Sequence, residues 1–321
     1  MKSIFSVVVF AAVAALAPFA VFAQAYPVKP VRILVPWPPG GANDVVGRVV
    51  AQRLTEQFGQ QVIVENRGGA SGVVGADLVA KGPGDGYTIM VHSATHVANP
   101  SLYKKIPYDT LKDFTGVTPL AVQVGMLVVH PSLPVKTTKE FVALGKARPG
   151  QITYGSSGNG SFVHLAMALL NATTNTQMIH IPFKGGGPAT IALASGEIQA
   201  MTATIGSLVP HIDSKRVRPI GVTSAKRVSQ YPNVPAISES VPGYEFVAWI
   251  GAFVASSTPR PIVDRLNSEF RKALANPDTA KILGAQTLDP MPMSPEEFAR
   301  LLKTDYDKYE RVIKLTGAKL D

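Results

Sequence analysis

The 321-residue sequence contains no cysteine. Disulfides, thiolate zinc sites and cysteine nucleophiles are therefore excluded, so that an apolar core has to stabilise the fold. Acidic residues are also few, since 22 Asp and Glu stand against 31 Lys and Arg and the formal net charge is +9. The basic residues form no run longer than pairs such as Lys104-Lys105. Charge scattered in this way argues against nucleic-acid binding and is compatible with a small anionic ligand.

Long hydrophobic runs are absent beyond the N-terminus. Residues 4–21 are almost wholly apolar, follow the short basic start Met1-Lys2-Ser3, and precede a small-x-small site at Ala23-Gln24-Ala25. This layout predicts a secretory signal peptide over residues 1–25 and an exported mature chain that begins at Tyr26. An uncleaved membrane anchor is the alternative, because the run approaches the ~18 apolar residues that a membrane span needs.

Strand and helix patterns alternate along the first part of the mature chain. Nearly continuous β-branched and apolar residues at Val31–Val35 predict a buried strand, and helical spacing of apolar residues follows from Asp44 to Gly59. Strand-like runs recur at Gln61–Glu65 and Tyr87–His92. Strand–helix–strand–helix–strand is the order of a parallel α/β sheet.

The same alternation recurs from residue 125 to residue 223, and helical patterns close the chain after residue 260. The passages Thr115–Gln123 and Pro242–Trp249 are predicted to cross between two lobes, which leaves a ligand cleft between them. The predicted fold is therefore α/β, two-lobed, with two crossover segments. The predicted division is 26–122 for the first part of lobe 1, 123–246 for lobe 2, and 247–321 for the return to lobe 1.

Three glycine-rich loops follow predicted strands, at the strand ends where open α/β sheets bind ligands. In the first, Pro36–Asp44, prolines preset the backbone, and Gly40 and Gly41 let amide groups approach a ligand. Asp44 is predicted to fix this loop and the helix start, because a carboxylate repels an anionic ligand. A rigid turn without a ligand is the simpler interpretation of the same residues.

The other two loops combine free backbone amides with a helix start. Residues 154–161 (YGSSGNGS) offer N–H groups, small hydroxyls and a helix N-terminus, which together make an anion-binding site. Residues 183–188 (FKGGGP) expose three glycine amides beside Lys184, whose side chain fits a surface position equally well.

Motifs of catalysis and metal binding are missing. The spacing of His92 and His96 lacks the glutamate of a zinc helix motif, and no carboxylate is placed to orient a Ser157–His164 pair. We therefore predict no catalytic residue, no metal and no cofactor. A secreted serine hydrolase that uses Ser156 or Ser157 stays an alternative.

Several of these stretches carry a family resemblance that covers nearly the whole mature chain. The runs YPVKPVRILVPWPPGGANDVVGR, VIVENRGGASGVVGADLVAKGPGDGYTIMV, YGSSGNGS, IPFKGGGPA and TPRPIVDRLNSEF occur in order. With them the sequence resembles the extracytoplasmic receptors of tripartite tricarboxylate transporters, the Bug family. The resemblance implies a periplasmic binding protein whose lobes close on a small carboxylate and hand it to membrane transporter subunits, without catalysis. A monomer is expected.

The resemblance also implies a set of ligand-binding residues. The family's loops correspond to residues 37–44 and 93–95 in lobe 1, and to 155–161, the glycines from 185 and the strand end 202–203 in lobe 2. The predicted ligand-binding residues are Trp37, Pro38, Pro39, Gly40, Gly41, Ala42, Asp44, Ser93, Ala94, Thr95, Tyr154, Gly155, Ser156, Ser157, Gly158, Ser161, Gly185, Gly186, Gly187, Thr202 and Ala203.

Three questions stay open at this point: the role of His92, the membrane partner and the class of acid. His92 stands where the resemblance leads us to expect a small or apolar residue, and we interpret it as a strand end rather than a determinant of specificity. A binding protein that signals to a membrane sensor would have the same pocket. Dicarboxylates, tricarboxylates, amino acids and aromatic acids all fit a clamp of amides and ordered waters.

Overall fold

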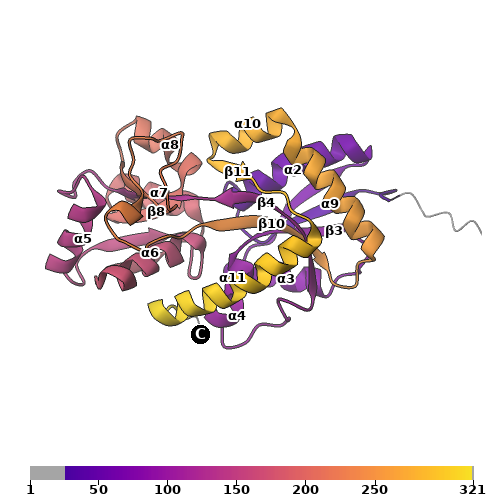
Figure 1. Cartoon of the computed structure of the whole chain (residues 1–321), viewed down its shortest axis with the longest axis horizontal. Helices are drawn as coiled ribbons and strands as arrows, with labels where there is room; N and C mark the ends of the chain where they lie inside the picture. Colours follow the sequence, from indigo (N-terminus) through magenta and orange to yellow (C-terminus); the bar gives the residue numbers. More distant parts are fainter. Residues whose placement is uncertain (1–25, 320–321) are drawn as a thin grey trace, which may run out of the picture.

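The structure, a computed structural model, describes residues 26–319, so the predicted signal peptide lies outside the described residues. Two sheets lie side by side, each covered by helices, and two long strands pass through the middle of the molecule (Figure 1). The protein is thus a two-lobed, mixed α/β fold. Within residues 26–319 no helix combines the length and the apolar character that a membrane span requires.

The first sheet combines three parallel strands with three antiparallel ones. Its strands are β1 (Val31–Val35), β2 (Val62–Asn66), β3 (Thr88–Ser93), β4 (Phe114–Gln123), β10 (Ala248–Ala255) and β11 (Leu288–Pro290). Their order is β11-β4-β10-β3-β1-β2, with β1 parallel to β2 and β3, and β10 antiparallel to β3 and β4. The parallel part was predicted from the strand–helix alternation.

The second sheet repeats the parallel arrangement in three of its strands. The strands are β5 (Gly125–Val129), β6 (Thr153–Ser156), β7 (Ile179–Pro182), β8 (Ala200–Thr204) and β9 (Arg218–Val222). Their order is β7-β6-β8-β5-β9, with β6 parallel to β7 and β8. Parallel strands have their carboxyl ends at one edge, so the loops that leave β6, β7 and β8 gather there.

Helices cover both sheets. Those packed around the first sheet are α2 (Ala42–Phe58), α3 (Val73–Ala80), α4 (Thr95–Leu102), α9 (Arg260–Ala275) and α10 (Pro277–Ala285), with the 3₁₀ turn η1 (Ala70–Gly72). Those of the second are α5 (Thr138–Ala147), α6 (Phe162–Thr174), α7 (Gly186–Ser195) and α8 (Ile205–Asp213), with η2 (Ile237–Glu239) before the return. The helix predicted from Asp44 is α2, whose apolar residues Val46, Val50 and Leu54 are fully buried.

Helix α4 and strand β11 were not predicted. Helix α4 has no polar face, since both histidine and apolar residues along it are buried, and Pro100 lies inside it. A helix buried on every side gives no amphipathic period to detect. Strand β11 is only three residues long and ends at Pro290, so its pairing with β4 is a tertiary contact rather than a local preference. The passage predicted as the first crossing is a full strand, β4.

The last helix, α11 (Pro295–Thr316), joins the two lobes. It packs on α4 and β4 of the first lobe and on α6 of the second, and it runs below both lobes in Figure 1. In its middle, the Asp305 carboxylate accepts a hydrogen bond of 2.7 Å from Trp249 Nε1 on β10, and Asp305 is 8% exposed. Apolar residues from both lobes form one continuous cluster with α11, so the lobes share part of their core.

Replacing Trp249 with phenylalanine is expected to lower the free energy of unfolding by about 2 kcal/mol, because Asp305 then stays buried without this donor. The change is measured by urea denaturation. The double variant Trp249→Phe/Asp305→Leu should be more stable than Trp249→Phe alone, since no carboxylate is left unpaired. Equal stability of the two variants would contradict a stabilising role for this hydrogen bond.

Candidate functional site

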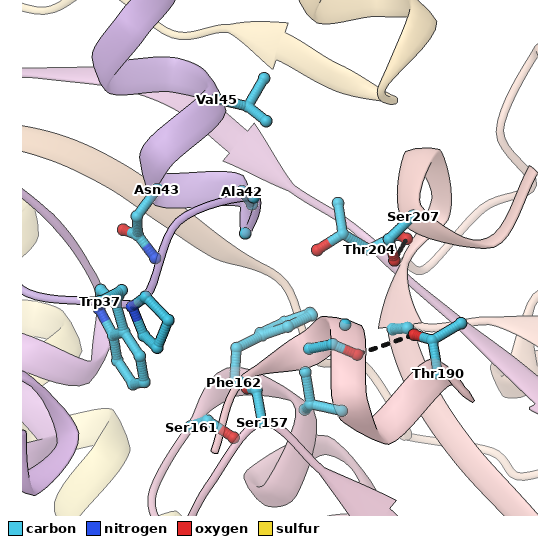
Figure 2. Close-up of a pocket in the computed structure, with 18 of the residues that line it drawn as sticks. Trp37, Ala42, Asn43, Val45, Ser157, Ser161, Phe162, Thr190, Thr204 and Ser207 are labelled. Atoms are coloured by element: carbon cyan, nitrogen blue, oxygen red, sulfur yellow. Dashed lines mark hydrogen bonds between the residues drawn. The ribbon is translucent and has the colours of Figure 1, made fainter. Parts of the chain in front are cut away.

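A cavity of about 370 Å³ lies between the lobes. Figure 2 shows that Trp37, Ala42 and Asn43 of the first lobe face Ser157, Phe162 and Thr190 of the second across it. Among the lining residues from the described range 26–319, Lys184 is the only one with a formal charge. The lining residues are Trp37 to Asn43, Val45, Ser93, Gln123, Ser157, Ser161 to Val163, Lys184 to Pro188, Thr190, Ile191, Met201, Ala203, Thr204, Ser207, His211, Gln286 and Leu288.

Several helices begin at this cavity with free backbone amides. The residues before the first turns of α2, α7 and α8 are Gly41, Gly185 and Thr204, and none of the three caps its helix through a side chain. All three line the cavity. Helix α6 also starts here, with Ser161 Oγ accepting from the N–H of His164. Uncapped helix N-termini carry partial positive charge and unsatisfied N–H donors, which suit an anion.

Asp44 fixes the first glycine-rich loop, Pro36–Asp44, from the side that faces away from the cavity. Its carboxylate accepts hydrogen bonds from the Gly40 N–H at 3.0 Å, from Arg48 Nε at 3.0 and 3.1 Å, and from Asn66 Nδ2 at 2.9 Å. Burial alone would raise the pKa of Asp44, but the bonds from Arg48, Gly40 and Asn66 and the charge of Arg48 hold that pKa below its usual range. Asp44 is 4% exposed and is not among the residues that line the cavity.

Replacing Asp44 with alanine is expected to lower the free energy of unfolding by about 2 kcal/mol and to weaken ligand binding, because Gly40 and Asn66 lose their acceptor. The folded-state pKa is depressed, so this stabilisation is present above the unfolded pKa of about 4 and is lost as the pH falls through the folded value. Arg48→Ala serves as the control. It removes only a half-exposed partner and should cost less than about 1 kcal/mol in urea denaturation. Equal losses in the two variants would contradict the loop-fixing role.

Thirteen of the predicted ligand-binding residues line the cavity. They come from all three glycine-rich loops and from two strand ends. They are Trp37, Pro38, Pro39, Gly40, Gly41, Ala42, Ser93, Ser157, Ser161, Gly185, Gly186, Gly187 and Ala203.

The structure places the other predicted residues of the first lobe behind the cavity wall. Asp44 supports the loop as described above. Ala94 and Thr95 are buried at the start of α4, where the Ala94 N–H donates to the Trp249 carbonyl and Thr95 Oγ1 accepts from Ser93 Oγ. These residues therefore position the wall without lining it.

In the second lobe, strand alternation and local turns direct several predicted residues elsewhere. Thr202 Oγ1 donates to the Val163 carbonyl, whereas Ala203, the next residue, lines the cavity. Tyr154 faces a second cavity of about 480 Å³. The remaining predicted residues are Gly155, Ser156 and Gly158, on the inner side of the loop at residues 154–161. A Cβ at Gly155 would meet Ile198, and the Gly158 N–H donates to Ser156 Oγ.

Some lining residues were not predicted. Asn43 lies within the predicted loop 37–44, and Phe162 and Thr204 directly follow the predicted Ser161 and Ala203. Gln123 and Gln286 come from β4 and the segment before β11, and no local motif marks either position. Gln123 Nε2 donates to Thr204 Oγ1 at 3.0 Å, which ties the connection between the lobes to the start of α8.

A serine–histidine contact exists, but not in the cavity between the lobes. Ser156 Oγ lies 2.6 Å from His180 Nε2, and His180 stacks on His164 with ring centroids 3.9 Å apart. Ser156 is fully buried, and its hydroxyl also contacts the Gly158 carbonyl. Within the described residues, no carboxylate is hydrogen-bonded to His180, and no group of three histidine or acidic side chains is gathered for a metal. The pair is a buried hydrogen bond beneath residues 156–161, and it supports that loop.

The fold and the cavity together define a two-lobed solute-binding protein, with a ligand-sized cavity between lobes and helix N-termini from both. A comparison with protein families agrees: residues 46–318 match the tripartite tricarboxylate transporter family receptor. The chain belongs to this family, whose members are periplasmic solute-binding receptors rather than enzymes. The resemblance to the Bug family is thereby confirmed.

Three relatives illustrate the similarity. Protein BugT of Bordetella pertussis is 34% identical, over 94% of this chain and 93% of its own. The structure of R. palustris Rpa4515 with adipate has 32% identity and a TM-score of 0.88, and covers 92% of this chain and 100% of its own. MatC (Rpa3494) from Rhodopseudomonas palustris with bound malate has 30% identity and a TM-score of 0.84, and covers 90% of this chain and 100% of its own.

Proposed function

We propose that this protein is a periplasmic receptor that captures a small carboxylate between its lobes and delivers it to a tripartite tricarboxylate-type membrane transporter. In this proposal, residues 1–25 are a cleaved signal peptide, and the mature chain acts as a monomer. Lobe 1 consists of 26–122 and 247–321, lobe 2 consists of 123–246, and the two close on the ligand.

The observation that carries the proposal is the meeting of three uncapped helix N-termini, of α2, α7 and α8, at one cavity that no acidic side chain lines. Their free N–H groups attract and bind a carboxylate without an arginine. The family membership and the acids named with Rpa4515 and MatC point to the same ligand class. The cross-lobe hydrogen bond from Ser71 Oγ to the Asn159 carbonyl, 2.5 Å, supports closure of the two lobes on a ligand.

A thermal-shift screen of the ligand-stripped mature protein against aliphatic and aromatic carboxylates tests the proposal. At about 100 times its dissociation constant, a bound acid adds roughly 2.7 kcal/mol of stability, which raises the melting temperature measurably. The matched control is the neutral amide of each active acid, which should give no shift because the helix N-termini favour negative charge. Equal shifts for acid and amide, or no shift with any carboxylate, would overturn the proposal.

A further inference from the structure

Trp37 forms part of the cavity wall on the first lobe, directly after β1 (Figure 2). Its indole Nε1–H donates a hydrogen bond of 3.3 Å to His92 Nδ1 on β3, and the two rings meet edge to face at 5.9 Å. The indole nitrogen is the only polar atom of the side chain. The ring therefore offers the cavity an apolar surface.

His92 is held rigidly behind this wall. It is fully buried, the His96 ring lies 5.5 Å away, and a Cβ on Gly72 would lie only 2.3 Å from His92 Nε2. Because Nδ1 accepts from Trp37, the hydrogen of the neutral ring is on Nε2, which has no hydrogen-bond partner in the described part of the chain. An unpartnered buried N–H lowers stability, and exceptions of this kind concentrate at functional sites.

The opposite wall is also aromatic. Phe162, the first residue of α6, lines the cavity from the second lobe and stacks on Phe246 with ring centroids 5.5 Å apart. Figure 2 shows the rings of Trp37 and Phe162 bordering the same space. Val45, Val163, Met201 and Leu288 add further apolar side chains to the cavity lining.

Most hydroxyl groups around the cavity are already engaged. Thr190 Oγ1 donates to the Gly186 carbonyl at 2.9 Å, Ser207 Oγ donates to the Thr204 carbonyl at 2.7 Å, and Thr204 Oγ1 accepts from Gln123. A volume of about 370 Å³ equals roughly twelve waters at ~30 Å³ each, enough for a ring that carries one or two carboxylates.

We propose that His92 is a positioning residue that holds Trp37 with its indole nitrogen turned out of the cavity, and that the resulting Trp37–Phe162 pair of walls selects carboxylates with an aromatic body over open-chain ones. This inference rests on the proposed function, whose helix N-termini bind the carboxylate itself. Aromatic contacts add affinity beyond the area they bury, and a fixed ring loses little freedom on binding. This role goes beyond the interpretation of His92 as a strand end, since His92 lies one residue before the end of β3.

The test measures dissociation constants of benzoate, cyclohexanecarboxylate, adipate and malate by calorimetry, for the full mature protein and for three variants. The wild type should bind benzoate at least about tenfold more tightly than malate. His92→Leu, which removes the acceptor, should weaken benzoate binding about threefold to tenfold and leave malate binding unchanged. His92→Asn keeps an acceptor near the Nδ1 position and should restore benzoate affinity. Tryptophan emission should shift to the red in His92→Leu but not in His92→Asn.

Trp37→Phe provides the matched background, because it keeps an aromatic ring and removes the indole N–H. In this background, His92→Leu should have no further effect on benzoate affinity, whereas a purely structural role would weaken all four acids equally in both backgrounds. Malate or adipate binding as tightly as benzoate would overturn the inference and leave the carboxylate receptor standing. If no acid binds at all, the proposed function itself fails. If His92→Leu does not fold, the order of the four dissociation constants in the wild type and in Trp37→Phe tests the selectivity for an aromatic body.

Discussion

Lowering the pH from 7 to 5 is expected to reduce the free energy of unfolding of the ligand-free protein by roughly 7 kcal/mol. Burial lowers the pKa of His96 to about 3 and that of His164 to about 4. Burial with the nearby His96 lowers the pKa of His92 well below its ordinary value, and burial with the nearby His164 lowers that of His180 to about 3. The folded protein keeps all four rings neutral. The unfolded chain takes up a proton on each as the pH falls below about 6.5.

The direction of this change in stability follows from the number of protons that each state binds. The unfolded state binds more protons, so the stability is present above the unfolded pKa and is lost as the pH falls toward the folded values. Each neutral histidine contributes about 1.4 kcal/mol per pH unit in that window. Such a loss is comparable with the whole stability of an ordinary domain, ~5–15 kcal/mol, so acid unfolding should begin near pH 5.

Urea denaturation at several pH values measures this slope. His96→Phe is the control, because His96 lies among Phe114, Phe253 and Tyr108 and an apolar ring fits its surroundings. The slope of unfolding free energy against pH reports how many more protons the unfolded state binds. In this variant, that number should be smaller by about one between pH 6 and 5. A wild-type stability that does not change over this range, or an unaltered slope in His96→Phe, would contradict the expectation.

Replacing Gly41 with valine is expected to weaken carboxylate binding at least about 100-fold, equal to ~2.7 kcal/mol, with little change in the stability of the ligand-free protein. Gly41 has an extended backbone, φ −83° and ψ 170°, which valine adopts readily. A Cβ there meets nothing closer than the Pro38 carbonyl at 3.9 Å. The branched side chain therefore fits the fold but occupies the space before the α2 N-terminus, where Gly41 lines the cavity.

Calorimetric titration with the acid that gives the largest thermal shift measures this loss. Gly41→Ala is the graded control, because a single methyl group should cost less affinity than the branched side chain. Full affinity in Gly41→Val would mean that the carboxylate is not held at the start of α2. An equal loss of ligand-free stability in both variants would point to a folding effect instead.

The parallel parts of the two sheets were predictable because their strands and helices have strong local patterns. Strand β1 is a continuous apolar run, and helix α2 repeats its apolar residues at helical spacing before Gly59. Helix α4 was not predicted because most of its residues are buried and it has no amphipathic pattern. Strand β11 was not predicted because it pairs with β4, which is far away in the sequence. Buried helices and short strands lack the alternation that a sequence can reveal.

The candidate site was predicted to the level of loops but not of individual side chains. Thr202 and Ala203 illustrate the limit, since one donates to a backbone carbonyl and the next lines the cavity. Alternation puts neighbouring residues on opposite faces of a strand, but in a strand covered on both faces the sequence does not tell which face meets the cavity. Gln123 and Gln286 reach the cavity only because the tertiary fold brings the two lobes together, and no local sequence pattern shows this.

The connections between the lobes have a consequence for the entropy of closure. Val124 alone separates β4 of one sheet from β5 of the other. The longer return before β10 is anchored, because the Tyr244 hydroxyl donates to the Ala166 carbonyl and the Phe246 N–H to the Thr223 carbonyl. In the proposed closure of the lobes, only a few backbone torsions would therefore change, and α11, which packs on both lobes, would shift by small shear movements. Fixing so few torsions costs little conformational entropy, so that most of the interaction energy between ligand and cavity remains available as affinity.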